Sequence, residues 1–255
     1  MQKGFYNLTS GMLSQTRRLD VIANNMSNVS TAGYKAQTYT DITFEDVMYQ
    51  LTGNKDKNNP QDLGNQSYIL APSELYVDHT QGIPEETGMN LDFAIHEAEG
   101  YFAIQTANGT EYTRNGNFIL DDEHYLALAS GHGRVLGSNG EPIFMATDQF
   151  RADGYGNIYL TNMDDAYAGT IGVFTFADNE QLVINESGLF GANGQEATVI
   201  ENARIDWKSV ERSNVDLIDE MTKMITTQRA LQSAAQVLKM YDTLLSKASS
   251  EVGRV

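Results

Sequence analysis

The chain has 255 residues, of which 41% are hydrophobic, and this is enough for one large or two small domains with a hydrophobic core. It contains no cysteine, which excludes disulfides, thiolate metal sites and cysteine catalysis. The net charge of −17 lies in the middle of the chain, because residues 1–40 carry +3 and residues 207–255 carry +1, and this distribution argues against nucleic-acid binding.

Residues 1–35 predict an N-terminal coiled-coil helix. Apolar side chains follow one another in steps of three and four over about three and a half heptads, with one glutamine in the missing place. The positions are Phe5, Leu8, Met12, Gln15, Leu19, Ile22, Met26 and Val29. Taken alone, this segment also fits an ordinary surface helix on a globular core.

Residues 36–67 predict an extended arm that ends in a polar loop. The helical period disappears from about Phe44, and residues 54–67 are rich in Asn, Asp, Gln and Lys. We therefore expect no packed element in the second half of this segment.

Residues 68–205 predict an antiparallel β domain of many short strands. Apolar runs alternate with turn residues, and Asn108-Gly109 and Asn115-Gly116 fit two-residue type I′ hairpin turns. Further reversals are expected at Asp121-Asp122, at 131–133 and at 138–140.

Residues 206–255 predict a C-terminal coiled-coil helix, with helix-start residues just before Leu217. The steps again alternate between four and three, and a polar residue in such a seam lowers stability but fixes register. The seam is Leu217, Met221, Met224, Gln228, Leu231, Ala235, Leu238, Asp242 and Leu245.

The predicted fold class is therefore α+β, with terminal heptad helices that pair as a coiled coil around an inserted β-rich domain. Other apolar positions lie outside both seams, and a single helix pair cannot bury them. These positions are Val21, Ile218, Ile225, Val237 and Leu244. We expect neighbouring subunits to supply the helices that cover them.

Residue patterns of known catalytic sites are missing. The four histidines have no metal-ligand spacing, and the glycine-rich run at 131–140 lacks the Lys-Ser/Thr of a phosphate loop. No Gly-x-Ser-x-Gly elbow occurs. We expect no enzyme, no cofactor and no metal site.

The N-terminal segment resembles the signature of bacterial flagellar axial proteins, the rod and hook group. The resemblance rests on Leu19, Asp20, Ile22, Ala23, Asn24, Asn25, Asn28, Thr31, Gly33, Tyr34 and Lys35. The sequence departs from the pattern at Met26, Ser27 and Ser30.

Two further matches follow in the order that this family has. Residues 87–137 resemble its β domain, including the run from Tyr112 to Gly116, and residues 213–239 resemble its C-terminal segment. Leu231 stands where the family usually has tyrosine, which puts the packing of the last helix in doubt.

The resemblance implies a structural subunit of the flagellar basal-body rod that transmits torque from motor to hook. Such proteins pass through the flagellar type III export apparatus and assemble into a homo-oligomeric helical array with other rod and hook subunits. We expect export without a cleaved signal peptide, location in the periplasm-spanning rod, and no membrane span. The proximal rod is slightly favoured over the distal rod.

Two alternatives remain open at this point. The chain fits a hook-type axial subunit in the same array, or, less well, a secreted β-rich binding module with helical ends. The seam residues above and the polar joint that follows the first helix are the expected assembly interface. For Asn24, Asn25 and Asn28, we expect amides that bond neighbouring subunits or the chain leaving the helix, with Gly33 allowing a sharp exit and Tyr34 beginning the arm.

Overall fold

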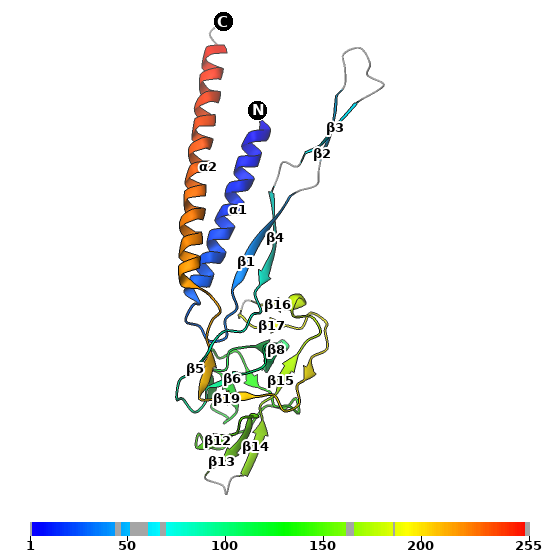
Figure 1. The fold of residues 1–255 in the computed structure, drawn as a ribbon, viewed down its shortest axis with the longest axis vertical. Coiled ribbons are helices and arrows are strands. Elements are labelled where there is room, and N and C mark those ends of the chain that lie inside the picture. The colour runs from blue at the N-terminus through cyan, green and yellow to red at the C-terminus, as the bar shows by residue number, and fades with distance from the viewer. Residues whose placement is uncertain are drawn as a thin grey trace. The chain divides into compact units, whose positions relative to one another are not determined.

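A computed structural model describes residues 2–43, 47–51, 61–66, 70–161, 166–185 and 187–252. The chain forms two compact units (Figure 1). The first unit contains residues 1–26, 37–76 and 217–255, and the second contains residues 27–36 and 77–216. The four segments predicted from the sequence cut across these units, because each unit combines stretches that are distant in the chain.

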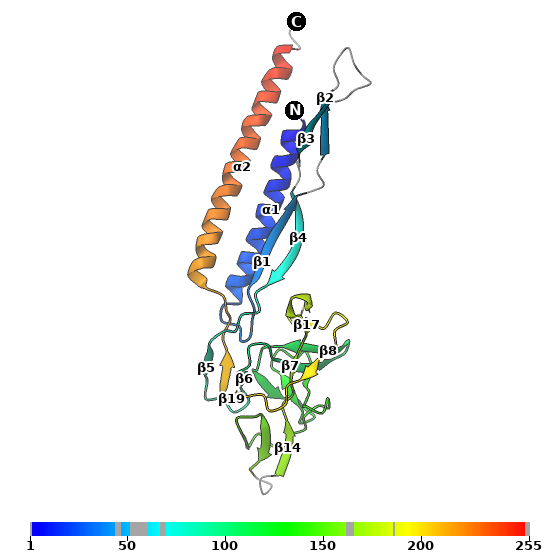
Figure 2. The same ribbon diagram turned by 45° about the vertical axis from the view of Figure 1, so that its right-hand side comes forward.

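The first unit contains two long helices that run antiparallel, so that the chain begins and ends at the same end of the unit (Figures 1 and 2). Helix α1 spans Gln2–Ser27 and helix α2 spans Leu217–Val252. At 1.5 Å per residue their lengths are about 39 Å and about 54 Å. Helix α1 ends before Val29, so this predicted seam position lies beyond the helix.

The first unit also contains two pairs of strands. Strand β1 (Gln37–Thr43) pairs with β4 (Leu70–Val77), and β2 (Val47–Leu51) pairs antiparallel with β3 (Gln61–Gln66). The polar loop predicted over residues 54–67 is therefore wrong for β3, where strand pairing overrides the low β propensity of Gln, Asp, Gly and Asn. Residues 54–60 and 67 lie outside the described residues.

The second unit is built around a nine-stranded antiparallel sheet. The main path runs β16-β17-β8-β7-β11-β10-β9, and β15 pairs with both β7 and β18. The strands are β7 Tyr101–Thr106, β8 Gly109–Thr113, β9 Phe118–Leu120, β10 Leu126–Leu128, β11 Arg134–Val135, β15 Val173–Thr175, β16 Val183–Ile184, β17 Phe190–Gly191 and β18 Thr198–Val199.

Three small sheets and a short 3₁₀ helix, η1 (Asn179–Gln181), complete the second unit. One sheet joins β12 (Phe150–Ala152), β13 (Asn157–Leu160) and β14 (Ala166–Thr170). The others pair β6 (Phe93–Ile95) with β19 (Ile205–Trp207), and β5 (Pro84–Glu86) with β20 (Ser209–Glu211). Residues 206–207 and 209–211 thus lie in strands, although they belong to the predicted C-terminal helix segment 206–255.

Strand β7 separates two hydrophobic clusters. Successive side chains of a strand point to opposite faces, and here Phe102 and Ile104 join one cluster while Tyr101 and Ala103 join the other. All four side chains are buried. This explains why the first four residues of β7, Tyr101 to Ile104, are continuously apolar rather than alternating.

The predicted reversals are confirmed at three places, but the two type I′ turns are wrong. In the β7–β8 hairpin Thr106 is paired with Gly109, so the connecting residues are Ala107 and Asn108, and neither has a positive φ. Gly116 also lacks a positive φ, and its position is set by space, because a Cβ there would lie 1.6 Å from the Phe93 carbonyl oxygen.

The two units differ strongly in charge. The second unit has seven basic and 23 acidic residues in its sequence, a net charge of −16, whereas the first has ten basic and eleven acidic residues, a net charge of −1. Neither described helix is long and apolar enough to cross a membrane. The fold is α+β, as the sequence predicts.

Candidate assembly interface

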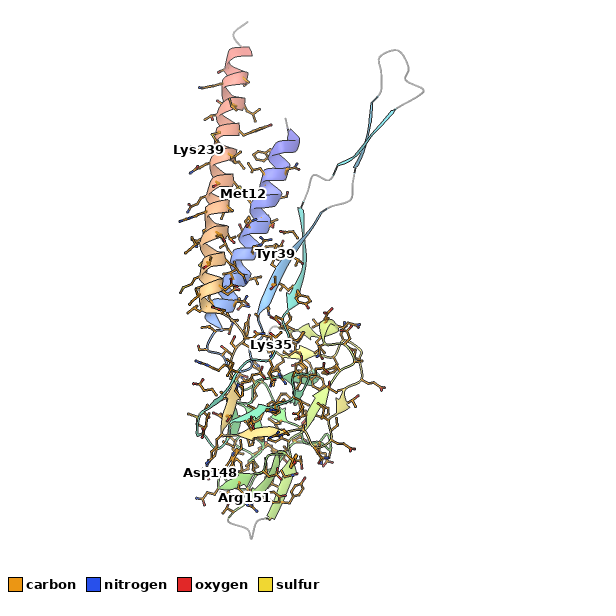
Figure 3. All side chains as sticks on the ribbon, viewed as in Figure 1. Met12, Lys35, Tyr39, Asp148, Arg151 and Lys239 are labelled. Carbon is orange, nitrogen blue, oxygen red and sulfur yellow. The ribbon has the colours of Figure 1, made fainter. Side chains whose placement is uncertain are left out.

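Most of the predicted seam on α1 stays accessible in the single chain. Ile22 is buried, but Phe5 is 44% exposed. The remaining helical seam positions are half-buried: Leu8, Met12, Gln15, Leu19 and Met26 (Met12 is labelled in Figure 3). The structure therefore leaves this seam available to a further partner.

Asn25 lies away from the seam and is buried. Its Nδ2 donates to the Gln37 carbonyl oxygen at 2.8 Å, and its Oδ1 accepts from the Gln37 backbone N–H at 3.0 Å. Its Nδ2 also lies 3.4 Å from Glu220 Oε2 on α2. Of the two roles predicted for this amide, the structure shows the bond to the chain that leaves the helix.

Strand β1 is further held to α1 by Asp41. The Ser14 hydroxyl donates to Asp41 Oδ1 at 2.5 Å, and Arg18 forms an ion pair with Asp41 Oδ2 at 3.0 Å. Ser14 and Tyr39 are both buried, and Tyr39 is labelled on β1 in Figure 3. Polar side chains of α1 that lie outside its apolar seam therefore hold β1 to the helix.

A cleft of about 380 Å³ lies between α1, β1 and α2. Its lining mixes charged and neutral residues, and includes Arg18, Ile22, Tyr39, Lys223 and Thr227. The three elements therefore enclose open space at this level instead of a continuous apolar core.

At two places in α2 the buried residue lies one position before the predicted seam residue. Glu220 and Thr227 are buried, whereas Met221 and Gln228 are exposed. The alternate seam positions Met224, Leu231 and Leu238 agree better with the prediction, because their side chains are half-buried. A shift of one residue turns a helix by about 100°, so half of the predicted seam faces away from the shielded side.

Large apolar side chains are consequently exposed along both helices. On α1 the clearest case is Leu13, which is 53% exposed. On α2 the exposed apolar residues are Leu217, Ile218, Met221, Ile225, Val237, Met240, Leu244 and Leu245. An accessible apolar surface of this extent is typical of a protein–protein contact.

The residues after α1 belong to the second unit. Asn28 closes a local turn, because its carbonyl accepts from the Thr31 N–H at 3.1 Å and its Oδ1 from the Thr31 hydroxyl at 3.1 Å. Gly33 has φ +67°, and a Cβ there would lie 2.3 Å from the Arg114 carbonyl carbon. Tyr34 is half-buried and Asn24, on α1, is exposed. Only glycine fits at position 33, because both φ and space exclude a side chain.

The turn is followed by Lys35, which forms a buried ion cluster with Glu211 and Arg114. Lys35 Nζ lies 2.6 Å from Glu211 Oε1, and Arg114 Nε lies 3.0 Å from Glu211 Oε2, with side chains 1–2% exposed. The second contact is an ion pair without hydrogen-bond geometry. Burial of the ammonium group lowers the pKa of Lys35, while Glu211 acts in the opposite direction. Burial likewise lowers the pKa of Arg114.

Three backbone carbonyls also hold the Arg114 guanidinium. It donates to the carbonyls of Glu97 and Gly100 at 2.7 and 2.5 Å, and to that of Ala98 at 3.2 Å. Arg114 and Lys35 lie in the stretches that resemble the family, but the sequence assigned neither of them a role and did not single out Glu211. The sign of such a cluster in the sequence is that these charged residues stand in otherwise apolar or turn-rich segments.

The described part of the chain contains no candidate metal cluster. No group of three His, Asp or Glu side chains there could hold a metal ion. The arrangement of buried ion pairs and exposed apolar helix faces suits a structural protein.

Three known family patterns match the chain in sequence order. Residues 5–35 match the flagella basal body rod protein family, residues 94–189 the D1 domain of flagellar hook protein FlgE/F/G, and residues 208–251 the C-terminal region of flagellar basal body rod FlgEFG proteins. The first and last matches contain most of α1 and α2, and the middle match contains seven of the nine strands of the main sheet, all but β17 and β18.

Full-length relatives agree with these matches. The chain is 33% identical to the flagellar basal-body rod protein FlgG of Bacillus subtilis, over 97% of this chain and 98% of the relative. It is 31% identical to FlgF of Mesorhizobium japonicum, over 99% of each chain, and 26% identical to the flagellar hook-basal body complex protein FlhO of Bacillus subtilis, over all of both. The relatives are structural proteins of the flagellum and not enzymes. The chain therefore belongs to the family of flagellar basal-body rod proteins, as a structural axial subunit.

Proposed function

We propose that this protein polymerises helically through its terminal helices to build the basal-body rod, and that the assembled rod transmits torque from motor to hook. The observation that carries the proposal is the exposed apolar surface of α1 and α2. Its exposure in the single chain is costly in water, and burial against neighbouring subunits removes that cost.

The lengths of the two helices support an interface between subunits. Helix α2 is longer than α1, and it extends beyond the start of α1 in both views (Figures 1 and 2). Val237, Met240 and Leu244 lie in the C-terminal half of α2 and are 45%, 57% and 65% exposed. Helices of neighbouring copies are the partners that we propose for this part of α2.

Charge also favours the helices as the assembly elements. The first unit carries a net charge of −1 and the second −16. Copies that pack through the nearly neutral unit avoid most of the like-charge repulsion that the acidic unit would cause. We propose that the acidic units form the outer layer of the array.

We propose that the antiparallel α1 and α2 pair as a coiled coil within this assembly. Each helix, or a helix of a second copy, then covers the predicted seam residues of the other. The half-buried state of Met12, Leu19 and Met224 in the single chain supports this arrangement. Passage through the flagellar export apparatus without a cleaved signal peptide is part of the same proposal and rests on family membership.

The test compares two charge-adding variants of α2. Met240→Lys/Leu244→Lys places two cations on the exposed apolar surface, and Gln232→Lys/Gln236→Lys places the same charge on exposed polar positions. We expect both monomers to keep the helical circular dichroism of the wild type, but only the first variant to abolish rod assembly and motility. Normal motility of the first variant would contradict the proposal.

A hook-type axial subunit is the second candidate. It is favoured by the match of residues 94–189 to the flagellar hook protein FlgE/F/G D1 domain and by the likeness to the hook-basal body complex protein FlhO. Electron microscopy of basal bodies from a deletion strain separates the two. Loss of rod and hook supports the rod subunit, and a complete rod without a hook supports the hook-type subunit.

A further inference from the structure

The chain passes between its two units four times, after residues 26, 36, 76 and 216. Three of these connections enter or leave the second unit at or next to the short segments 33–36, 78–82 and 211–214. These segments are far apart in sequence, yet polar contacts join all of them. We call these contacts the connection clip.

Asn214 forms the first half of the clip. Its Oδ1 accepts from the Ala36 N–H at 2.7 Å, and its Nδ2 donates to the carbonyls of Asp78 at 2.9 Å and Thr80 at 3.2 Å. The Asp78 N–H also donates to the Ala36 carbonyl at 2.8 Å. One side chain therefore joins all three segments.

Glu211 forms the second half. Its Oε1 accepts from Lys35 Nζ at 2.6 Å and from the Gly82 N–H at 2.8 Å, and its backbone carbonyl accepts from the Gly33 N–H at 2.8 Å. Lys35 Nζ in turn donates to the Thr80 carbonyl at 2.6 Å. The Arg114 contact ties Glu211 to the end of β8 in the main sheet. The clip is thus anchored in the body of the unit.

The chemistry of position 214 is specific to an amide. The site needs an acceptor toward one backbone N–H and a donor toward carbonyl oxygens at the same time, which asparagine supplies. Aspartate would place its negative charge against the carbonyls of Asp78 and Thr80, and alanine would bond none of the three groups. Asn214 is only half-buried, so its replacement leaves no large cavity.

We propose that the connection clip couples the connecting segments mechanically, so that a force on one segment is shared by all three and by the main sheet. This inference rests on the proposed function, because torque passed through a rod subunit must cross these connections. Asn214 and Glu211 are positioning residues in this role, and neither needs to contact a neighbouring subunit.

The first test is hydrogen exchange of the full chain, measured by NMR at single amides. The variants are Asn214→Asp and Asn214→Ala. The control is Asn157→Ala, which removes a half-buried asparagine of the same unit that bonds Asp153 and Thr170. The Asp78 and Gly33 N–H groups do not bond Asn214 directly, so they report whether the clip acts as one unit.

We expect the Ala36, Asp78 and Gly33 amides of both Asn214 variants to exchange about fivefold to tenfold faster, with no change at the Ile104 amide in β7. The control should leave all of these amides unchanged. Faster exchange at Ala36 alone would overturn the proposal, because Asn214 would then be a local bond and not part of a coupled clip.

The second test is motility under load. Cells that carry Asn214→Asp should assemble rods but swim at a reduced speed in viscous medium, relative to Asn157→Ala cells. Wild-type speed under load would overturn the shared-force role while leaving the rod function intact. If a deletion strain still assembles a rod, the proposed rod function is wrong. The exchange experiment then still decides whether the clip acts as one unit.

Discussion

The side chain of Asn25 forms both backbone hydrogen bonds of Gln37, with a donor distance of 2.8 Å and an acceptor distance of 3.0 Å. The amide thus acts toward the first residue of β1 as a neighbouring strand would act. Since Asn25 is only 2% exposed, water cannot replace it in the folded chain. An asparagine near the end of α1, which is a poor helix former, therefore fixes where β1 begins relative to the helix.

Asn25→Ala should destabilise the first unit by about 1–3 kcal/mol, because two hydrogen bonds to the Gln37 backbone, each contributing about 0.5–1.5 kcal/mol, would be lost. The measurement is chemical denaturation followed by circular dichroism at a helical wavelength. Asn24→Ala is the control at an exposed neighbouring position, and we expect a change within about 0.5 kcal/mol. Equal losses in the two variants would show that the Gln37 bonds contribute nothing.

Glu211→Gln should lower the stability of the second unit by about 3–5 kcal/mol. The substitution leaves the buried cations Lys35 and Arg114 without their counter-charge, and removing one partner of a buried ion pair is strongly destabilising. Trp207 fluorescence reports unfolding of this unit. Glu85→Gln, in the exposed ion pair with Arg212, should change stability by less than about 1 kcal/mol. A smaller loss at Glu211 than at Glu85 would refute the interpretation of the cluster.

Gly33→Ala should cost more stability than Gly131→Ala. Both glycines have a positive φ, +67° and +77°, but a Cβ at Gly33 would lie 2.3 Å from backbone atoms, whereas the space around Gly131 is open. The strain of a positive φ alone is about 1–3 kcal/mol, and the backbone clash adds to it only at Gly33. Thermal denaturation of the two variants gives the comparison, and equal melting temperatures would mean that Gly33 does not contact the Arg114 backbone.

Tyr101 should make the second unit sensitive to alkaline pH. Burial raises the pKa of this phenol to about 12 from 10.0, so the folded state retains a proton that the unfolded state loses. The resulting stabilisation is complete below pH 10 and is lost as pH rises toward 12, a difference of about 3 kcal/mol for two pKa units. Denaturation curves between pH 9 and 12 should fall more steeply for the wild type than for Tyr101→Phe.

The exposed Tyr155→Phe variant is the control for this pH dependence and should follow the wild-type curve. Tyr101→Phe also loses the contact between the phenol oxygen and His79 Nδ1 at 2.8 Å, which lowers stability at every pH without changing the slope. A slope unchanged by Tyr101→Phe would contradict the role of its buried phenol.

The fold class was predictable because the apolar period changes along the chain, from steps of three and four at the ends to short runs between turn residues. The helix face was not fully predictable. Ile218, Met221 and Ile225 form an alternative apolar row on α2, and the period alone does not show which row faces its own chain. The shielded row contains Glu220 and Thr227, which sequence patterns assign to solvent.

The polar part of the interface was only partly predictable. A bond to the chain leaving the helix was one of the two roles predicted for Asn25, but the partner Gln37 is set by the return of β1 along α1. Glu211 and Asn214 bond Lys35 and Ala36, which lie more than 100 residues away in the chain, and no local pattern encodes such a pairing. The type I′ turn predicted at Asn108-Gly109 is wrong because the register of the hairpin pairs Gly109 with Thr106, and this register overrides the Asn-Gly preference.

The most direct measurement of the central claim is cryo-electron microscopy of basal bodies isolated from the bacterium that encodes this chain. The account predicts that the chain is found in the axial rod, with α1 and α2 of successive copies packed together and the exposed apolar residues of α2 buried between copies. A rod from which this chain is absent, or one in which Met240 and Leu244 still face solvent, would contradict it.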